Sequence, residues 1–314
     1  MALGGKIEKL EIRAMNATFT ALLSLLMITA AASAQSTVPV NLYVADLSYD
    51  GGTIRIGSPR KLTADRGINS QPSFTPDGKS ILFVRRDSAN GQGDVYSIDL
   101  ASGAETRITS TPEMENSPTI LPDGSLMVIR WTPSTLFREW GPWIYNMKGV
   151  PIKGVLPGPD TVGYYVRLDS VTFAMMRPKA IGAIAIFDAR NGSMTDFDFR
   201  PANLPPQKIP GQAAISYTRV DSVGGNRIRR LDLVTHDTTE IAPAQPRRVV
   251  HAWTPRGTIL MGNGNAIFAL TPPAKTWTQV ASFAQPDLQE INAYVVSPAG
   301  DKLILISPVT PTRR

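Results

Sequence analysis

A turn motif that returns at a nearly fixed spacing constrains the fold of this chain more than any other feature of its sequence. Pro76-Asp77-Gly78 and its later copy beginning at Pro122 have reverse-turn chemistry, because proline fixes φ, aspartate caps the local backbone and glycine accepts a positive φ. The preceding segments are also alike ("NSQPSFTPDG" and "NSPTILPDG"). Weaker copies follow in steps of 46, 46, 42, 45 and 43 residues, at the positions Pro76, Pro122, Leu168, Pro210, Pro255 and Pro298.

A second landmark, a strand followed by a turn and another strand, alternates with the first along the chain. "VYSIDLASGAETRIT" is its clearest form, and its turn positions are Asp46, Asp99, Asn146, Asp188, Asp232 and Thr271. Each period therefore supplies four antiparallel strands, two around each landmark. Periods in the forties that hold four strands are typical of propeller blades.

The two ends of the chain carry complementary halves of one further unit. Residues 42–64 supply only the last two strands, and residues 288–309 supply only the first two. An unpaired strand edge invites aggregation, and pairing the two halves covers both edges. The sequence therefore predicts an all-β, six-bladed β-propeller of four-stranded antiparallel blades, closed by pairing 42–64 with 288–309.

Composition agrees with an all-β fold and excludes several kinds of partner. Short apolar runs lie between 26 prolines and 25 glycines, and helical periodicity is sustained only within residues 15–34. The net charge of +6 arises without a polybasic block, so neither nucleic acid nor a membrane surface is indicated as a partner. The absence of cysteine excludes structural disulfides and a lipid-anchored cysteine.

Residues 1–34 have the pattern of a secretory signal peptide. Basic residues precede an apolar run that closes on Ala32-Ser33-Ala34, which is an A-x-A cleavage pattern. Met15 is an alternative start. We expect cleavage before Gln35, which leaves 35–314 as a single propeller domain, periplasmic or secreted, without a membrane span.

The chain offers few residues for catalysis. Its two histidines are His236, expected in a solvated turn, and His251, expected to be buried on an inner strand, with a catalytic role as the alternative for His251. A Ser-His-Asp hydrolase would need a G-x-S-x-G elbow, which does not occur. A zinc site would need three or four ligands, and residues 85–96 do not fit a calcium loop, so we expect no metal and no cofactor.

An aromatic segment favours a binding role. "TPSTLFREWGPW" (132–143) is predicted to be an insertion between two strands, with Gly141-Pro142 as a turn. Large aromatic side chains beside charged ones are typical of binding surfaces, although packing between blades is the alternative. The candidate residues here are Trp131, Arg138, Glu139, Trp140 and Trp143.

A ring of polar residues is predicted at the same end of the propeller, around the mouth of its channel. These residues stand six or seven positions before the turn positions and include Asn69, Ser70, Glu115, Asn116, Thr161, Asn203, Arg248 and Asn292. A polar ring beside an aromatic insertion would form a pocket. Ordinary polar turn residues are the alternative. The candidate binding residues from this end are Asn69, Glu115, Asn116, Arg248 and His251.

"QPSFTPDGKSILFVRRD" followed by "DVYSIDLASGAETRIT" resembles the TolB-type, WD40-like Pro-Asp-Gly propeller repeat. The full motif covers about 68–112, half of it covers 114–131, and degenerate copies cover most of the remainder. The resemblance implies a periplasmic propeller that serves as a binding scaffold in envelope assembly. Such a motif is specific for the fold and says little about activity.

Function hypotheses of three classes follow. The leading one is an exported, monomeric, non-catalytic scaffold for an envelope protein or peptide. The alternative is a propeller enzyme that acts on a carbohydrate or other small molecule at the channel mouth, which requires converging carboxylates. A propeller derived from a peptidase cap is disfavoured, because that class needs a hydrolase domain of roughly 200 residues.

Overall fold

The computed structural model describes residues 38–86, 91–133, 138–157, 161–178, 180–221, 223 and 225–309. They lie in the compact unit Thr37–Arg314, and the chain's other unit, Met1–Ser36, falls outside the described residues. The regular structure of these ranges consists of twenty-five strands, and no helix in them is long and apolar enough to cross a bilayer.

Four of the five sheets have four antiparallel strands, arranged in chain order. They are β8 (Met114–Ile120), β9 (Leu126–Pro133), β10 (Arg138–Tyr145) and β11 (Pro151–Gly154); β12 (Tyr164–Arg167), β13 (Thr172–Arg177), β14 (Ala183–Asp188) and β15 (Ser193–Phe199); β16 (Gln207–Lys208), β17 (Ala214–Arg219), β18 (Arg227–Asp232) and β19 (Thr238–Pro243); and β20 (Ala252–Trp253), β21 (Ile259–Asn263), β22 (Ala266–Leu270) and β23 (Thr278–Ser282).

The fifth sheet has nine strands in the order β24-β25-β1-β4-β5-β6-β7, with β2 and β3 also paired to β1. Its strands are β1 (Val40–Asp50), β2 (Thr53–Ile56), β3 (Arg60–Lys61), β4 (Ile68–Phe74), β5 (Ser80–Arg86), β6 (Gly93–Asp99), β7 (Glu105–Arg107), β24 (Asn292–Val296) and β25 (Lys302–Pro308). A single parallel pair, Val40 with Ile68, joins β1 to β4.

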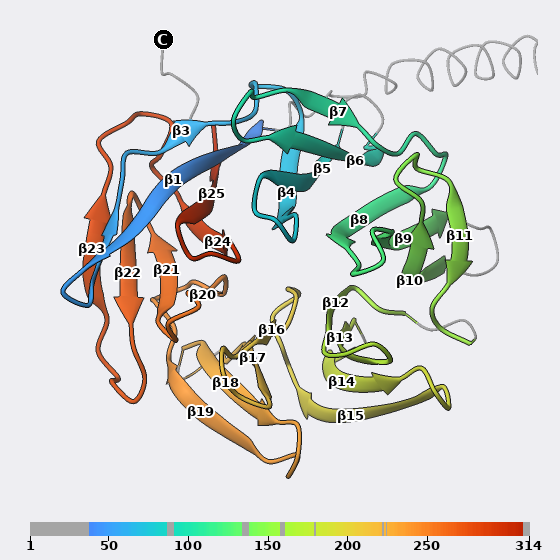
Figure 1. Cartoon of the computed structure of the whole chain (residues 1–314). Coiled ribbons are helices and arrows are strands. Elements are labelled where there is room, and N and C mark those ends of the chain that lie inside the picture. Colours follow the sequence, from blue (N-terminus) through green and yellow to red (C-terminus); the bar gives the residue numbers. More distant parts are fainter. Residues whose placement is uncertain are drawn as a thin grey trace, which may run out of the picture. The chain divides into compact units, whose positions relative to one another are not determined.

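Strands from the two ends of the described chain pair with each other in this nine-stranded sheet. β25 runs antiparallel to β1 over seven residue pairs, from Val40 with Pro308 to Asp46 with Lys302. Figure 1 shows the sheets standing around a common centre, with β4, β8, β12, β16, β20 and β24 nearest to it. We call these six the inner strands, and the side chains that meet at the centre come from them.

The predicted turns lie where the repeat placed them. At the first landmark, the Gly78 amide donates to the Thr75 carbonyl at 2.9 Å, and Gly300 makes the same bond to Ser297 at 2.9 Å. At the second landmark, the Asp99 carboxylate accepts the Ser102 amide at 2.7 Å, and Asp232 accepts Thr235 at 2.9 Å. Local hydrogen bonding of this kind is why aspartate recurs in turns.

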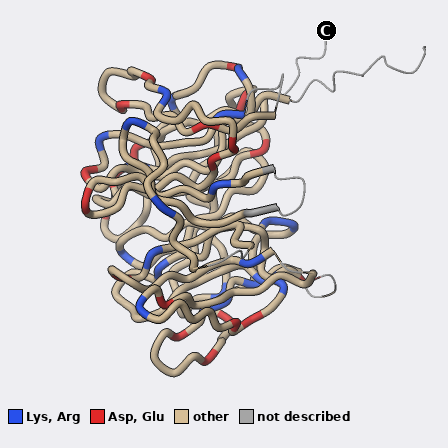
Figure 2. Tube along the Cα trace, turned by 90° about the vertical axis from the view of Figure 1, so that its right-hand side faces the viewer, with Lys and Arg blue, Asp and Glu red and all other residues tan. Residues whose placement is uncertain are grey.

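The hydrophobic core lies between neighbouring sheets. One cluster joins Leu82 and Val95 of β5 and β6 to Leu126, Val128 and Tyr145 of β9 and β10. Another joins β1 and β2 to β21 and β22, so the N-terminal strands also pack on the C-terminal part of the chain. Burial of this kind stabilises a protein by about 25 cal/mol per Å² of apolar surface. Charged residues are interspersed along the trace of the chain (Figure 2).

The aromatic segment differs from its prediction as an inserted loop. β9 continues to Pro133 and β10 begins at Arg138, so Gly141 and Pro142 lie inside a strand, opposite Arg130 and Ile129. The prediction of a turn at Gly141-Pro142 was therefore wrong, and 134–137 lies outside the described residues. Proline has no N–H to donate at this position. Its carbonyl still accepts the Val155 amide at 2.9 Å, so Pro142 keeps one backbone hydrogen bond to the neighbouring segment.

Candidate functional site

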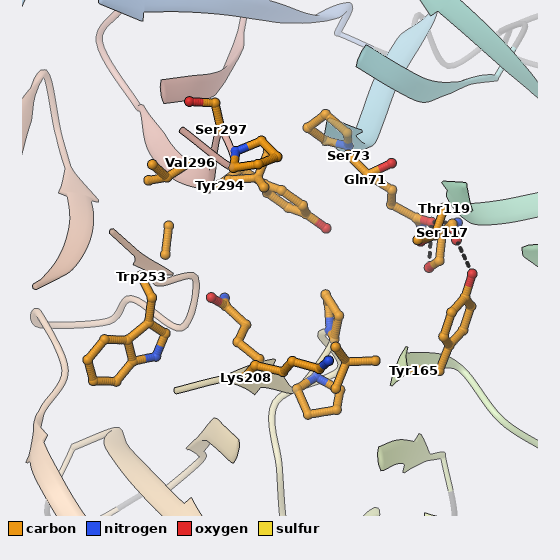
Figure 3. A pocket seen from close by; sticks show the side chains of 18 of the residues that line it. Gln71, Ser73, Ser117, Thr119, Tyr165, Lys208, Trp253, Tyr294, Val296 and Ser297 are labelled. Atoms are coloured by element: carbon orange, nitrogen blue, oxygen red, sulfur yellow. Dashed lines mark hydrogen bonds between the residues drawn. The ribbon is translucent and has the colours of Figure 1, made fainter. Parts of the chain in front are cut away.

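A cavity of about 530 Å³ lies where the inner strands converge (Figure 3). All six inner strands contribute to it, together with the residues that follow them toward the first-landmark turns. Its lining consists of Gln71, Pro72, Ser73, Ser117, Pro118, Thr119, Tyr165, Val166, Pro205, Pro206, Gln207, Lys208, Pro210, Ala252, Trp253, Pro255, Tyr294, Val295, Val296, Ser297 and Pro298. Its volume lies within the range typical of ligand sites.

Two β-bulges shape one side of this cavity. Gln71 and Ser117 have positive φ values of 53° and 49°, and each stands directly before a proline. The register of β4 shifts between Ser70 and Ser73, and that of β8 shifts at the equivalent place. Positive φ in a residue other than glycine is uncommon, and bulges redirect side chains near functional sites.

Side-chain hydrogen bonds between neighbouring inner strands hold the bulges in place. The Gln71 Oε1 atom accepts the Ser117 amide at 2.5 Å, and Ser73 Oγ donates to the Pro118 carbonyl at 2.6 Å. The Tyr165 hydroxyl donates to the Met127 carbonyl at 2.9 Å and lies 3.1 Å from that of Ser117. Such bonds offset the cost of the strained backbone, so this wall is preformed.

The lining is mainly apolar, with seven prolines, and its polar groups are mostly neutral. Burial raises the pKa of Tyr294 and of Tyr165, so both phenols stay protonated as hydrogen-bonding groups at neutral pH. Figure 3 shows Tyr294 reaching toward the middle of the cavity. The lining residues contain one charged side chain, Lys208, and include no Asp, Glu or His. This arrangement can bind a ligand, and its lining residues offer no carboxylate or imidazole as a general base.

The predicted polar residues lie outside this lining, and Asn69 and Asn116 are buried in hydrogen bonds. Fully buried Asn69 accepts Arg85 Nε at 2.8 Å and donates to the Val40 carbonyl at 2.8 Å. Asn116 accepts Arg86 Nη2 at 3.1 Å and lies 3.4 Å from Gln71 Nε2. Asn116 thus contacts Gln71, which lines the cavity.

Glu115 is a fully buried carboxylate that three hydroxyl groups surround. It accepts Thr109 Oγ1 at 3.0 Å, the Tyr145 hydroxyl at 3.1 Å, and the hydroxyl of Thr111. Burial raises its pKa, the three hydroxyl bonds oppose that shift, and nearby Asp94 adds to it. The described residues contain no cluster of three or more groups that could hold a metal ion. Glu115 therefore joins two neighbouring sheets rather than facing the cavity.

Arg248 and His251 also make contacts outside the large cavity. Arg248 Nε donates to Asn263 Oδ1 at 3.1 Å and its guanidinium pairs with Glu290. His251 is buried, with Nε2 at 2.8 Å from Ser216 Oγ and Nδ1 at 3.2 Å from Thr218 Oγ1. His251 lines a small cavity of about 20 Å³, too small for a ligand, that shares Gln207 and Tyr294 with the large one, and Gln207 Nε2 donates to the His251 carbonyl. His236, by contrast, is exposed in a turn, as predicted.

The buried imidazole predicts a pH-dependent stability. Burial lowers the pKa of His251 to about 4, whereas an unfolded histidine titrates near 6.5. The unfolded state therefore binds a proton first, and the stability present above pH 6.5 is lost as pH falls toward 4. Wild type should lose about 3 kcal/mol more than His251→Gln between pH 7 and pH 4 in urea titrations. Equal losses would show that His251 is protonated in the folded state.

The tryptophans of the aromatic segment are partly buried in strands. Trp140 of β10 lies opposite Trp131 of β9 and packs against the cluster that contains Met127 and Val162. Trp143 stacks with Arg130, whose guanidinium carbon is 4.4 Å from the ring centroid. Arg138 and Glu139 pair through their backbones with Pro133 and Thr132, and their side chains lie outside the described part. The structure does not bring these residues together with Arg248.

These contacts predict a structural role for Trp140. Trp140→Ala should lower the free energy of unfolding by about 3 kcal/mol, because the substitution leaves a cavity beside Met127 and Val162. Urea unfolding followed by tryptophan fluorescence and circular dichroism measures this change. A stability within 0.5 kcal/mol of wild type, combined with weakened partner capture, would instead support the binding role predicted from the sequence.

The cavity residues themselves were missed by the sequence prediction. The predicted ring used residues at or near the starts of the inner strands, whereas the cavity is lined by residues one to seven positions later. A usable signal was present in the two clear repeats. Gln71-Pro72 follows Asn69-Ser70, and Ser117-Pro118 follows Glu115-Asn116. A residue before proline avoids helical backbone, which favours an irregular extended strand at that point.

Comparison of sequences connects the chain to known proteins. No family model matches it. Two curated proteins from Francisella tularensis strains, both called Tol-Pal system protein TolB, are 26% identical to it over 211 residues. The match covers 62% of this chain and 46% of each relative, so the chain spans about half the length of the curated relatives it matches.

Solved structures share its fold. A structure assigned to TolB of Agrobacterium tumefaciens has a TM-score of 0.63 and 14% identity, covering 86% of this chain and 99% of that one. TolB from Acinetobacter baumannii has a TM-score of 0.55 and 15% identity, covering 84% and 63%. An oligogalacturonate lyase in complex with manganese has a TM-score of 0.54 and 13% identity, covering 87% and 84%. These identities speak for the fold alone, and together with the curated matches they show that the chain is similar to TolB proteins and has a TolB-type β-propeller fold.

Proposed function

We propose that this protein is an exported, non-catalytic scaffold that binds a peptide segment of an envelope protein in the central cavity. The observation that carries the proposal is a preformed cavity of about 530 Å³ with an apolar, proline-rich lining and no carboxylate or imidazole among its lining residues. Its curated relatives are named as components of the Tol-Pal system, which agrees with a protein partner.

The scaffold is proposed to be a six-bladed propeller in one domain, 35–314, closed by its two ends. In this interpretation the nine-stranded sheet is two blades, β24-β25-β1 with β2 and β3, and β4 to β7, whose strands are joined by a single parallel residue pair, Val40 with Ile68. The seven residue pairs between β1 and β25 support this closure. Pairing of the two ends covers the free strand edges of both partial blades, and the closed ring gives the cavity a rigid wall.

The cavity suits an extended peptide better than a sugar. Apolar walls favour aliphatic or aromatic side chains, and the Oε1 atom of Gln207, whose amide nitrogen donates to the His251 carbonyl, can accept a hydrogen bond from a peptide backbone. Rigid proline rings lose little entropy when a ligand binds. A carbohydrate would need many more polar partners for its hydroxyl groups.

The enzyme alternative has less support. Fold likeness to an oligogalacturonate lyase raises it, yet fold alone does not supply an activity. Glycoside chemistry usually uses two carboxylates, and none of the lining residues is an aspartate or glutamate. Glu113 and Glu115 lie two residues apart, but Glu113 pairs with Arg130 and Glu115 accepts three hydroxyl groups.

The periplasmic location is proposed from the signal-like pattern of residues 1–34, which lie outside the described part. N-terminal sequencing of the exported protein should start at Gln35. A mature protein that starts at Met1 or Met15 would contradict this part of the proposal.

The proposed function is tested by comparing peptide binding to a variant with a blocked cavity and to a variant with an open one. Thr119 is half-buried and lines the cavity, so Thr119→Trp should fill part of it. Thr106→Trp, on the exposed strand β7, is the matched control. Peptides selected from a phage library on the wild type should bind the Thr106→Trp control equally and the Thr119→Trp variant at least tenfold more weakly. Equal binding to both variants, with unchanged melting temperatures, would contradict the proposal.

A further inference from the structure

A second hollow adjoins the central cavity at the side of the first-landmark turns. Its volume is about 340 Å³, and its lining includes Pro122, Arg167, Leu168, Asp169 and Lys208. Lys208 lines both hollows, so it stands where the cavity opens toward the surface. Figure 3 shows Lys208 on the opposite side of the cavity from Tyr294.

Arg167 and Lys208 are the basic side chains of this second hollow, which we call the rim of the cavity. Neither has a bonded acidic partner among the described residues. Lys208 Nζ donates to a neutral group, the Leu168 carbonyl, at 2.8 Å. The Arg167 side chain makes no hydrogen bond or ion pair with the described residues, although its backbone pairs with Phe173.

Burial is the main cause that lowers the pKa of Lys208, and the nearby charge of Arg167 lowers it further. Asp169 partly opposes this by raising the pKa of Lys208, and the charge of Arg167, after the hydrogen bonds from Ser125, helps to lower the pKa of Asp123. The two cations are therefore partly offset but have no bonded counter-ion, and an anion would relieve the remaining repulsion.

The carboxylates nearby are occupied by their own turns. Asp169 accepts the amides of Val171 and Thr172, each at 2.8 Å, and these bonds help to lower its pKa. Asp123 accepts the amide and the hydroxyl of Ser125 at 3.0 and 2.6 Å. Both therefore weaken the positive potential at the rim without bonding to either basic group.

We propose that Arg167 and Lys208 bind a carboxylate of the ligand whose apolar part occupies the cavity. This inference rests on the proposed function and names its ligand class, a peptide with apolar side chains and one carboxylate. A charge-assisted hydrogen bond to lysine or arginine is roughly twice as strong as a neutral one, and Arg167 can offer two parallel donors. An acidic side chain and a free C-terminus both supply this group.

Three synthetic peptides separate the sources of the carboxylate. They are Ac-Gly-Pro-Leu-Pro-Leu-Pro-Glu-amide, its Gln counterpart, and the Gln peptide with a free C-terminal acid. Isothermal titration should give at least tenfold tighter binding for one or both acidic peptides than for the neutral one. Raising the salt concentration from 50 to 300 mM should reduce that preference, because exposed charges are screened.

Variants of the full chain locate the effect. Arg167→Gln and Lys208→Met should each remove most of the acid preference while leaving the affinity for the neutral peptide within about threefold. Lys148→Gln, in an exposed turn, is the matched control and should retain the preference. Using both Arg167→Gln and Lys208→Met guards against a folding defect from loss of the Leu168 bond.

Each outcome has a distinct meaning. Equal affinity for acidic and neutral peptides would overturn the carboxylate site and leave the proposed function standing. Absence of binding by all three peptides would count against the proposed function as well. Tighter binding of oligogalacturonate than of every peptide would overturn the peptide assignment in favour of an acidic carbohydrate.

Discussion

Deleting residues 288–314 is expected to remove the cooperative unfolding transition of this protein. The deletion takes away β24 and β25, and with them the seven residue pairs that β25 makes with β1. It also removes Leu303, Ile304 and Leu305, which are all fully buried. The loss of several kcal/mol is comparable to the whole stability of a typical domain, about 5–15 kcal/mol.

A point substitution keeps this prediction testable if the truncated chain does not fold. Leu305 lies opposite Tyr43 in the β1–β25 pair, so Leu305→Ala should cost about 3 kcal/mol while the ladder persists. Thermal unfolding followed by circular dichroism measures both proteins. A truncated protein that melts at the wild-type temperature would contradict closure of the propeller by its two ends.

Gly262→Ala is expected to destabilise the protein by about 3 kcal/mol, a large effect for one added methyl group. A Cβ at Gly262 of β21 would lie 2.2 Å from the Ile291 carbonyl oxygen and 3.0 Å from the Asn292 Cα atom. Both neighbours are backbone, so strand β21 and the start of β24 would have to separate. Overpacking of this kind typically costs about 1–3 kcal/mol, and here no flexible side chain can move aside.

Gly154→Ala is the matched control for this substitution. Gly154 also lies in a strand without a positive φ, but its Cβ would meet only the Trp143 ring, at 3.6 Å. Its effect on the urea midpoint should be within about 0.5 kcal/mol. If both glycine variants were equally stable, the close approach of β21 to residues 291–292 would be in doubt.

The repeat in the sequence predicted the strand and turn pattern because turn chemistry is local. Proline, aspartate and glycine determine the backbone at Thr75–Gly78 whatever surrounds them, and the structure has a turn there. The segment around Trp140 was harder, since Gly141-Pro142 is a turn sequence by the same local rules. Pairing of β10 with β9 and packing of its side chains outweighed the local preference for a turn. Both depend on residues outside the segment, so the segment's own sequence does not reveal them.

The site was predicted less well because burial depends on the whole ring. Glu115 and Asn69 are polar residues at strand starts, and the sequence does not reveal that hydrogen bonds from neighbouring strands enclose them. Lys208 and Tyr294 belong to weak copies of the repeat, so they had no pattern to mark them. They meet because six inner strands converge, and this is a property of the fold rather than of any one repeat.

The most direct test of the central claim is amide hydrogen exchange of the wild type with and without a selected peptide. If the cavity is the binding site, exchange should slow in the inner-strand segments 117–120 and 294–297, which contribute to its lining. Exchange in β10 should stay unchanged. Slowing confined to 138–145, with the cavity segments unaffected, would contradict the account and assign binding to the aromatic strand instead.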